Sequence, residues 1–170
     1  MDTSFHSSFG LTLSITQVVQ TLVDFMRADE TANYKITIGS DSERRADGSA
    51  DFVTAIVIHR VGNGGRYFFR RALIGKKFHT LRDRIYEEVL LSLATAKELV
   101  ETVKALSLPW FSAEGGPASG WDFEIHVDVG ENGETRAMIQ ELVGMVRAHN
   151  FAAKTKPESY AASKVADRHV

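Results

Sequence analysis

The sequence has no cysteine, only three prolines, and no apolar run approaching the roughly 20 residues that a membrane-spanning helix needs. Without cysteine, the chain can form neither disulfide bonds nor thiolate metal sites. The first ten residues, MDTSFHSSFG, lack the basic and apolar regions of a secretory signal. We therefore expect a cytoplasmic protein that does not enter the membrane.

The composition is that of a globular protein with little net charge. The chain has 170 residues, of which 44% are hydrophobic and 25% are charged, and its formal net charge is −2. This length is typical of one domain with a sizeable core, so we predict a single domain over residues 1–170. Because the net charge gives no overall attraction to phosphate, nucleic-acid binding would require a local concentration of Lys and Arg.

The hydrophobic periodicity predicts an α/β fold. Ser14 and Gln17 have the spacing of a capping box, and the apolar stripe after them predicts an N-terminal helix over about 14–28. Three strands in hairpin succession should form an antiparallel meander, and later βα units should add parallel strands, giving a mixed sheet flanked by helices. The core, about 34–170, is predicted as three strands, helix, strand, helix, short strand and helix, within 34–40, 51–62, 66–75, 80–106, 122–130, 134–150, 151–157 and 159–170.

Two aspartates stand at the ends of predicted strands. Asp41 follows the alternating Ile36 and Ile38 but lies on the other face of that strand, and Asp128 stands near the end of the strand 122–130. Carboxylates held on rigid strands beside an open mouth are suited to binding a divalent cation. The alternative is that each aspartate merely begins a turn, as aspartate often does.

Two further carboxylates lie on predicted helices. On a helical wheel, Glu88 falls at the edge of the apolar face of the helix 80–106, whereas Glu87 points nearly opposite and should be solvated. A carboxylate beside an apolar face needs a partner, so Glu88 is predicted either to bind a metal or to form a salt bridge. Asp167 lies near the C-terminal end of the last helix, where the macrodipole disfavours a carboxylate. The alternative for Asp167 is a frayed, exposed helix end.

Four segments of the chain resemble a known family. The stretches IGSDS, RDRIYEEVLLSLA, HVDVGENGETRAMIQELVGMV and KTKPESYAASKVADRHV are similar to those of the YkuK-type family of predicted ribonuclease H-like proteins, over roughly residues 11–170. The resemblance implies a ribonuclease H fold whose active-site positions are Asp41, Glu88, Asp128 and Asp167. Glu43 departs from the family pattern, in which an amide usually follows GSDS, and it adds negative charge near the site.

The resemblance also implies a chemistry for these residues. The four carboxylates would bind Mg²⁺ or Mn²⁺, with two ions acting on one phosphodiester. Three auxiliary residues are predicted nearby: His126 on the face of Asp128, His169 two residues after Asp167, and the hydroxyl of Ser42. Either histidine could move protons, and a structural or surface role is the alternative for both.

Basic residues are most concentrated between 66 and 84, where they are interleaved with aromatic residues. This pattern predicts an edge that follows phosphates and stacks bases. The alternative is an edge strand whose charges prevent aggregation. Together with lysines near the last strand and helix, the predicted nucleic-acid-binding residues are Arg70, Arg71, Lys76, Lys77, Arg82, Lys156 and Lys164.

We therefore predict a metal-dependent nuclease that acts on RNA or on an RNA–DNA hybrid. The alternative is a non-catalytic module that binds nucleic acid or protein on the same fold, because a fold alone does not determine function. The four carboxylates favour the enzyme, since a pure binding module gains nothing from negative charge beside a polyanion.

Overall fold

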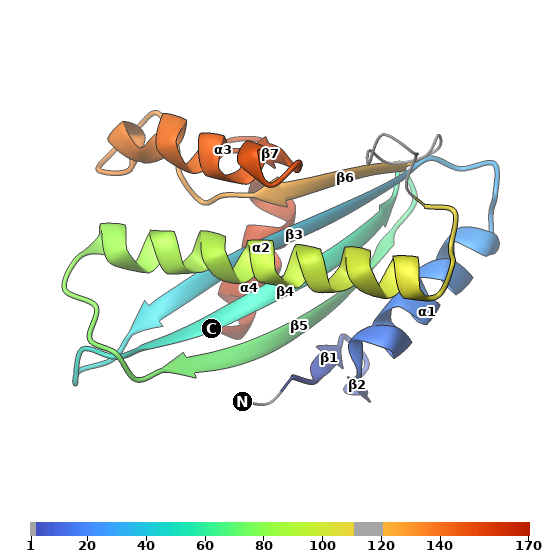
Figure 1. The fold of residues 1–170 in the computed structure, drawn as a ribbon, viewed down its shortest axis with the longest axis horizontal. Coiled ribbons are helices and arrows are strands. Elements are labelled where there is room, and N and C mark those ends of the chain that lie inside the picture. Colours follow the sequence, from blue (N-terminus) through green and yellow to red (C-terminus); the bar gives the residue numbers. More distant parts are fainter. Residues whose placement is uncertain (1–2, 111–120) are drawn as a thin grey trace.

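A mixed β-sheet forms the centre of the molecule (Figure 1). The computed structural model describes residues 3–110 and 121–170. The described residues form a seven-stranded sheet in the order β2-β1-β5-β4-β3-β6-β7, in which β3, β4 and β5 are antiparallel and β3, β6 and β7 are parallel. The predicted α/β sheet is confirmed. The strands of the core are β3 (Tyr34–Arg44), β4 (Ala50–Arg60), β5 (Gly65–Ile74), β6 (Trp121–His126) and β7 (Ala152–Lys154).

A short N-terminal hairpin extends the sheet beyond β5. Its strands, β1 (Phe5–Ser7) and β2 (Thr12–Leu13), pair with each other, and β1 also pairs with β5. The sequence analysis missed both strands, because two or three residues are too few to display a period of two. Gly10, with a φ of +78°, forms the turn between them.

Four helices cover the sheet: α1 (Ile15–Arg27), α2 (Leu81–Ala105), α3 (Ile139–Ala148) and α4 (Tyr160–His169). The predicted capping boxes at the starts of α1 and α2 are both present, with Ser14 bonded to Gln17 and Thr80 to Asp83. α1, α2 and α3 contribute to one apolar core with β3 and β4. α4 lies against the other face, so α2 passes in front of the sheet in Figure 1 and α4 behind it.

The two faces of the sheet differ in what they accept. The face toward α2 carries large aliphatic residues such as Ile36, Ile38 and Ile56, which are fully buried. On the other face α4 approaches closely, because β3 presents Gly39, where an added Cβ would lie 3.0 Å from the Cβ of Ala162. The glycine therefore lets α4 pack directly upon the strand that carries Asp41.

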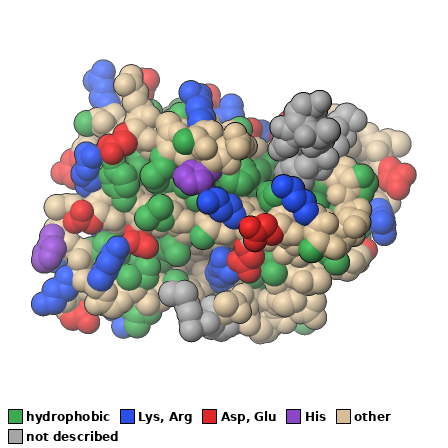
Figure 2. Space-filling model, in the orientation of Figure 1, with side chains coloured by type: hydrophobic (Ala, Val, Ile, Leu, Met, Phe, Trp, Pro, Cys, Tyr) green, Lys and Arg blue, Asp and Glu red, His purple; other side chains and the backbone are tan. Residues whose placement is uncertain are grey.

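The surface on the α2 side mixes both signs of charge. Figure 2 shows Lys and Arg side chains interspersed with Asp and Glu across this face. Within the described ranges, no helix has the length and apolar character that a membrane span requires.

Candidate active site

Asp41 and Asp128 lie near each other, but neither ends a strand as predicted. Asp41 lies within β3, three residues before its last residue, and Asp128 follows the last residue of β6 by two. β3 and β6 pair in parallel from Tyr34 and Trp121 to Gly39 and His126. Burial raises the pKa of Asp41 to about 6, and the negative charges of Asp128 and Asp167 add to the increase.

Glu88 reaches the same end of β3 from the opposite face of the sheet. Its residue is 6% exposed, and its carboxylate accepts a hydrogen bond of 2.6 Å from the hydroxyl of Ser42. Burial raises the pKa of Glu88 to about 8, with further increases from Asp41 and Asp128, although the Ser42 hydrogen bond acts the other way. Arg84, one turn earlier on α2, donates to the Ser42 carbonyl at 2.9 Å.

Asp167 completes the group from the last turn of α4. The residue is exposed. Its carboxyl group forms a hydrogen bond with that of Asp41, and its negative charge helps to raise the pKa of Asp41. A carboxylate at this end of a helix is unfavourable to the helix itself. Asp128 and Asp167 are thus close enough to Asp41 to raise its pKa, and Asp41 and Asp128 are close enough to raise that of Glu88, so the four predicted carboxylates influence one another in pairs from different segments of the chain.

Glu87 and Glu43, which lie near Glu88 and Asp41 in the sequence, have different surroundings from those two residues. Glu87 forms an ion pair with Lys76 and is half-buried, so the prediction that it would be solvated was wrong. Glu43 is exposed, and its charge is not among the main causes that raise the pKa of Asp41 or Glu88. Of the two adjacent glutamates, Glu88 is the one directed toward Asp41.

The donor chemistry of the group fits a hard divalent cation. In the part of the chain that the structure describes, no three His, Asp or Glu side chains already stand together as a metal cage. The hydroxyl of Ser42 donates a hydrogen bond to Glu88, and the ammonium of Lys156 forms an ion pair with Asp128. Burial and, to a lesser extent, neighbouring carboxylates raise the pKa values of Asp41 and Glu88, and oxygen ligands of this kind suit Mg²⁺ and Mn²⁺.

Lys156 acts as the counter-charge of Asp128. Its ammonium lies 2.9 Å from the carboxylate, and its backbone N–H donates to the carbonyl of Val129 at 2.8 Å. Gly130 gives this backbone room, since a Cβ at position 130 would lie 3.1 Å from that of Lys156. The lysine was predicted to bind nucleic acid, but here it is engaged with a predicted metal ligand.

Replacing this lysine should strengthen metal binding. We expect Lys156→Met to bind Mn²⁺ about three- to tenfold more tightly than the wild type, because a positive charge that competes for Asp128 is lost. Isothermal titration calorimetry without nucleic acid measures this effect. Lys154→Met, on β7, is the control and should bind Mn²⁺ like the wild type. Equal affinities of Lys156→Met and the wild type would show that the ion pair does not compete with the metal.

The two predicted auxiliary histidines are engaged in packing. His126 is buried, its Nε2 lies 3.2 Å from Glu124, and burial lowers its pKa. His169 stacks on Phe69 with ring centroids 3.8 Å apart, and its Nε2 lies 3.3 Å from the hydroxyl of Tyr67. These contacts occupy both rings, and their proposed role in proton transfer stays a prediction.

The predicted cations divide between the two faces of the sheet. Arg70 points toward α2, where it pairs with Glu98 at 2.7 Å and lies over the ring of Phe5. Arg71, the next residue, points to the α4 side, because successive strand residues alternate. Joint binding of one substrate by Arg70 and Arg71 therefore does not fit the structure.

Most of the other predicted cations near the carboxylates already have an acidic partner. Lys76 pairs with Glu87, and Arg82 lies 2.8 Å from Glu141. Lys77 is exposed and packs near Gly48, and Lys164 is exposed on α4. The sequence analysis did not select Arg84 as a site residue. Its spacing of four from Glu88 on the same helix was the available signal.

The comparisons with known proteins agree with this architecture. A family model described as "Ribonuclease H-like" matches residues 17–170. The uncharacterized protein YkuK of Bacillus subtilis (strain 168) is 31% identical over 168 residues, which cover 96% of this chain and 95% of that protein. No solved structure matches the chain.

Proposed function

The chain belongs to the ribonuclease H-like family, and from that premise we propose that it is a metal-dependent nuclease that hydrolyses phosphodiester bonds. One observation carries the proposal. Asp41 and Glu88 are carboxyl groups whose burial, with the nearby charge of Asp128 and, for Asp41, of Asp167, raises their pKa values to about 6 and about 8. A fold gains nothing from burying carboxyl groups in this way unless the charge has a use.

Asp41, Glu88, Asp128 and Asp167 would hold Mg²⁺ or Mn²⁺, with two ions at the site. Bound divalent ions lower the pKa of a water molecule and stabilise the charge that develops on a phosphodiester. The protein fixes the ligands from two sides. Ser42 orients Glu88 through their hydrogen bond, β3 holds Asp41 on a rigid strand, and Asp128 follows the end of β6 by two residues. Ser42 already donates its proton to Glu88, so it is poorly placed to act as a nucleophile.

The proposed substrate is RNA or an RNA–DNA hybrid. The family resemblance supports this class, and cations on both sides of the sheet could contact phosphates. Protein groups that contact the 2′-hydroxyl would distinguish RNA from DNA, and groups that contact an unpaired base would distinguish a single strand from a duplex.

A non-catalytic nucleic-acid-binding module is the second candidate. It is favoured by the ion pair between Lys156 and Asp128 and by the lack of a ready-made metal cage within the described residues. In that case Lys156 would be a permanent counter-charge, and the carboxylates would not need a metal.

Cleavage of a labelled panel separates the two candidates. The panel contains single-stranded RNA, RNA–DNA hybrid, and single- and double-stranded DNA, each with Mn²⁺, Mg²⁺ or EDTA. We expect cutting only with a metal ion, and its loss in Asp128→Asn purified in the same way. Binding without cutting in any metal would favour the module, and cutting that persists in Asp128→Asn would place the activity elsewhere.

A further inference from the structure

A recess lies along α4 on the side of the helix that faces β5. Its volume is about 330 Å³, within the range of small-ligand sites, and its lining includes Tyr67, Lys164 and Arg168. Among the described residues, its lining contains Lys and Arg but no carboxylate. The recess is therefore a positively charged hollow on the face opposite α2.

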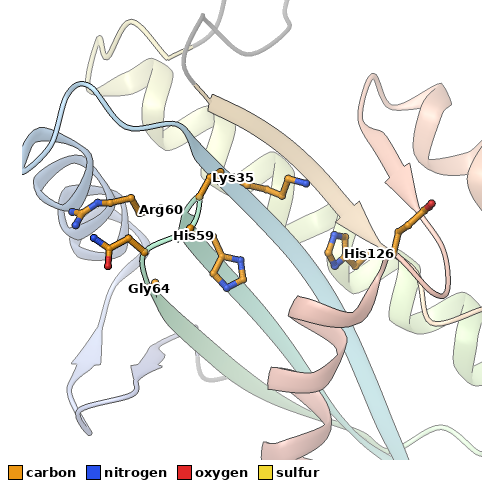
Figure 3. Close-up of a pocket in the computed structure, with 10 residues that line it drawn as sticks. Lys35, His59, Arg60, Gly64 and His126 are labelled. Carbon is orange, nitrogen blue, oxygen red and sulfur yellow. The ribbon is translucent and has the colours of Figure 1, made fainter.

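A second cavity continues this hollow toward the start of β5. It measures about 500 Å³ and shares His59 and Gly65 with the first. Figure 3 shows Lys35, His59 and His126 projecting from three neighbouring strands on one side of the sheet, with Arg60 turned away. We call the two cavities, together with the stretch of β5 that continues for about 13 Å from Tyr67 to Arg71, the track. The second cavity has one carboxylate in its lining, Glu158.

Aromatic rings stand in the middle of the track. Tyr67 and Phe69 project from β5, and His169 lies parallel to Phe69 at 3.8 Å with an angle of 8° between the rings. Tyr67 lies 5.6 Å from His169. All three residues are only partly buried, so the cluster offers ring surface on which a base could stack.

The arginines of the track are not neutralised by acids. Within the described residues, no ion pair joins Arg71 or Arg168 to a carboxylate, although Arg71 lies over the ring of Phe69 at 5.9 Å. Around the carboxylates, by contrast, Lys76, Arg82 and Lys156 are paired. The side of the molecule in Figure 2 also mixes both signs of charge. The α4 side of the sheet thus carries positive charge at Arg71 and Arg168 that no ion pair within the described residues neutralises.

The track leads to the carboxylates. Arg71 pairs across β4 with Val53, which pairs with Asp41, so the arginine is about 10 Å from the aspartate along one row of the sheet. The last turn of α4 carries Asp167, which contacts Asp41, and next to it Arg168, which lines the recess. A chain in the track would therefore end beside the candidate metal ligands.

We propose that this track binds single-stranded nucleic acid, with phosphates on Arg71 and Arg168 and a base stacked against Tyr67 and His169. The proposal rests on the proposed function and specifies the strand that its site would receive. An unpaired strand fits because a base within a duplex cannot present its face to an aromatic ring. A narrow recess beside a helix also accepts one strand more readily than two.

Binding measurements without metal test the proposal separately from catalysis. The probes are fluorescein-labelled uridine RNA of about 12 nucleotides, thymidine DNA of the same length, and an RNA–DNA hybrid duplex of the same length, in EDTA. Arg71→Gln with Arg168→Gln should weaken binding of the single strands about tenfold and reduce the slope of log K against log salt by about 1.4. Lys97→Gln with Lys104→Gln, exposed on α2, removes the same charge from the opposite face and should leave both values unchanged.

Substitution of the ring gives a second readout. Tyr67→Leu should weaken single-strand binding about tenfold without changing the salt slope, and Tyr67→Phe should retain affinity. The proposal would be overturned if the α4-side and α2-side double variants lost the same affinity for single strands. It would also be overturned if the hybrid bound more tightly than the single strands and its binding depended on Arg71. Binding that depends on Arg71 and Arg168 without any metal-dependent cutting would retain the track and reject the nuclease. Metal-dependent cutting that these variants leave unchanged would retain the nuclease and reject the track.

Discussion

Replacing Asp41 by asparagine should abolish metal-dependent cleavage while making the metal-free protein more stable. The rate should fall about a hundredfold or more, because a proposed metal ligand is lost. Stability should rise because burial and the charges of Asp128 and Asp167 disfavour the ionised carboxyl, whose pKa is raised to about 6. The gain at pH 8 should be about 1 kcal/mol, a value reduced for the partial exposure of the side chain.

Opposite changes in activity and stability distinguish a functional residue from a structural one. Cleavage assays and chemical denaturation in EDTA measure the two effects. Asp122→Asn is the matched control, since Asp122 is an exposed aspartate on β6, the strand that neighbours β3. It should change neither value. An Asp41→Asn protein that is less stable than the wild type would mean that Asp41 supports the fold and is not held there for a ligand.

The sequence was sufficient to predict the elements that have long periodic patterns or caps. Ser14 with Gln17 and Thr80 with Asp83 mark the starts of α1 and α2, because side-chain capping is a local property of four residues. The alternation around Ile36 and Ile38 gave the face of β3, and hence the side on which Asp41 lies. Short strands such as β1 have no such signal, because the pairing of Phe5–Ser7 with β5 is purely tertiary.

The sequence supplied the candidate residues of the site but not their surroundings. Asp128 lies near Asp41 because of contacts between residues far apart in the sequence, such as the parallel pairing of β3 with β6, which ends two residues before Asp128. The different environments of Arg70 and Arg71 depend on which helix covers each face of β5. No local pattern contains that information. A run of basic residues in the sequence therefore cannot distinguish Arg70, which is partly buried, from Arg71, which is exposed.

The pH dependence of stability provides the sharpest test of Glu88. The folded protein holds the proton of Glu88 up to pH about 8, whereas the unfolded chain releases it near the ordinary value of 4.5. Between these values folding takes up a proton, so stability of the metal-free protein should fall as pH rises from about 5 to 8. Glu88→Gln removes the part of this dependence above about pH 6, because Asp41, whose pKa is raised to about 6, still contributes at lower pH. It should be about 2–4 kcal/mol more stable than the wild type at pH 9.

Glu87→Gln is the matched control, because Glu87 is the adjacent residue on α2 and has the same side chain. It loses only its ion pair with Lys76, which should cost no more than about 1 kcal/mol and leave the pH slope unchanged. Denaturation curves in EDTA at several pH values between 5 and 9 give both quantities. Saturating Mn²⁺ should then stabilise the wild type more than Glu88→Gln, since binding to the folded state alone adds to its stability. A Glu88→Gln protein with the wild-type pH slope would show that the proton is held elsewhere, and equal stabilisation by Mn²⁺ would remove Glu88 from the metal ligands.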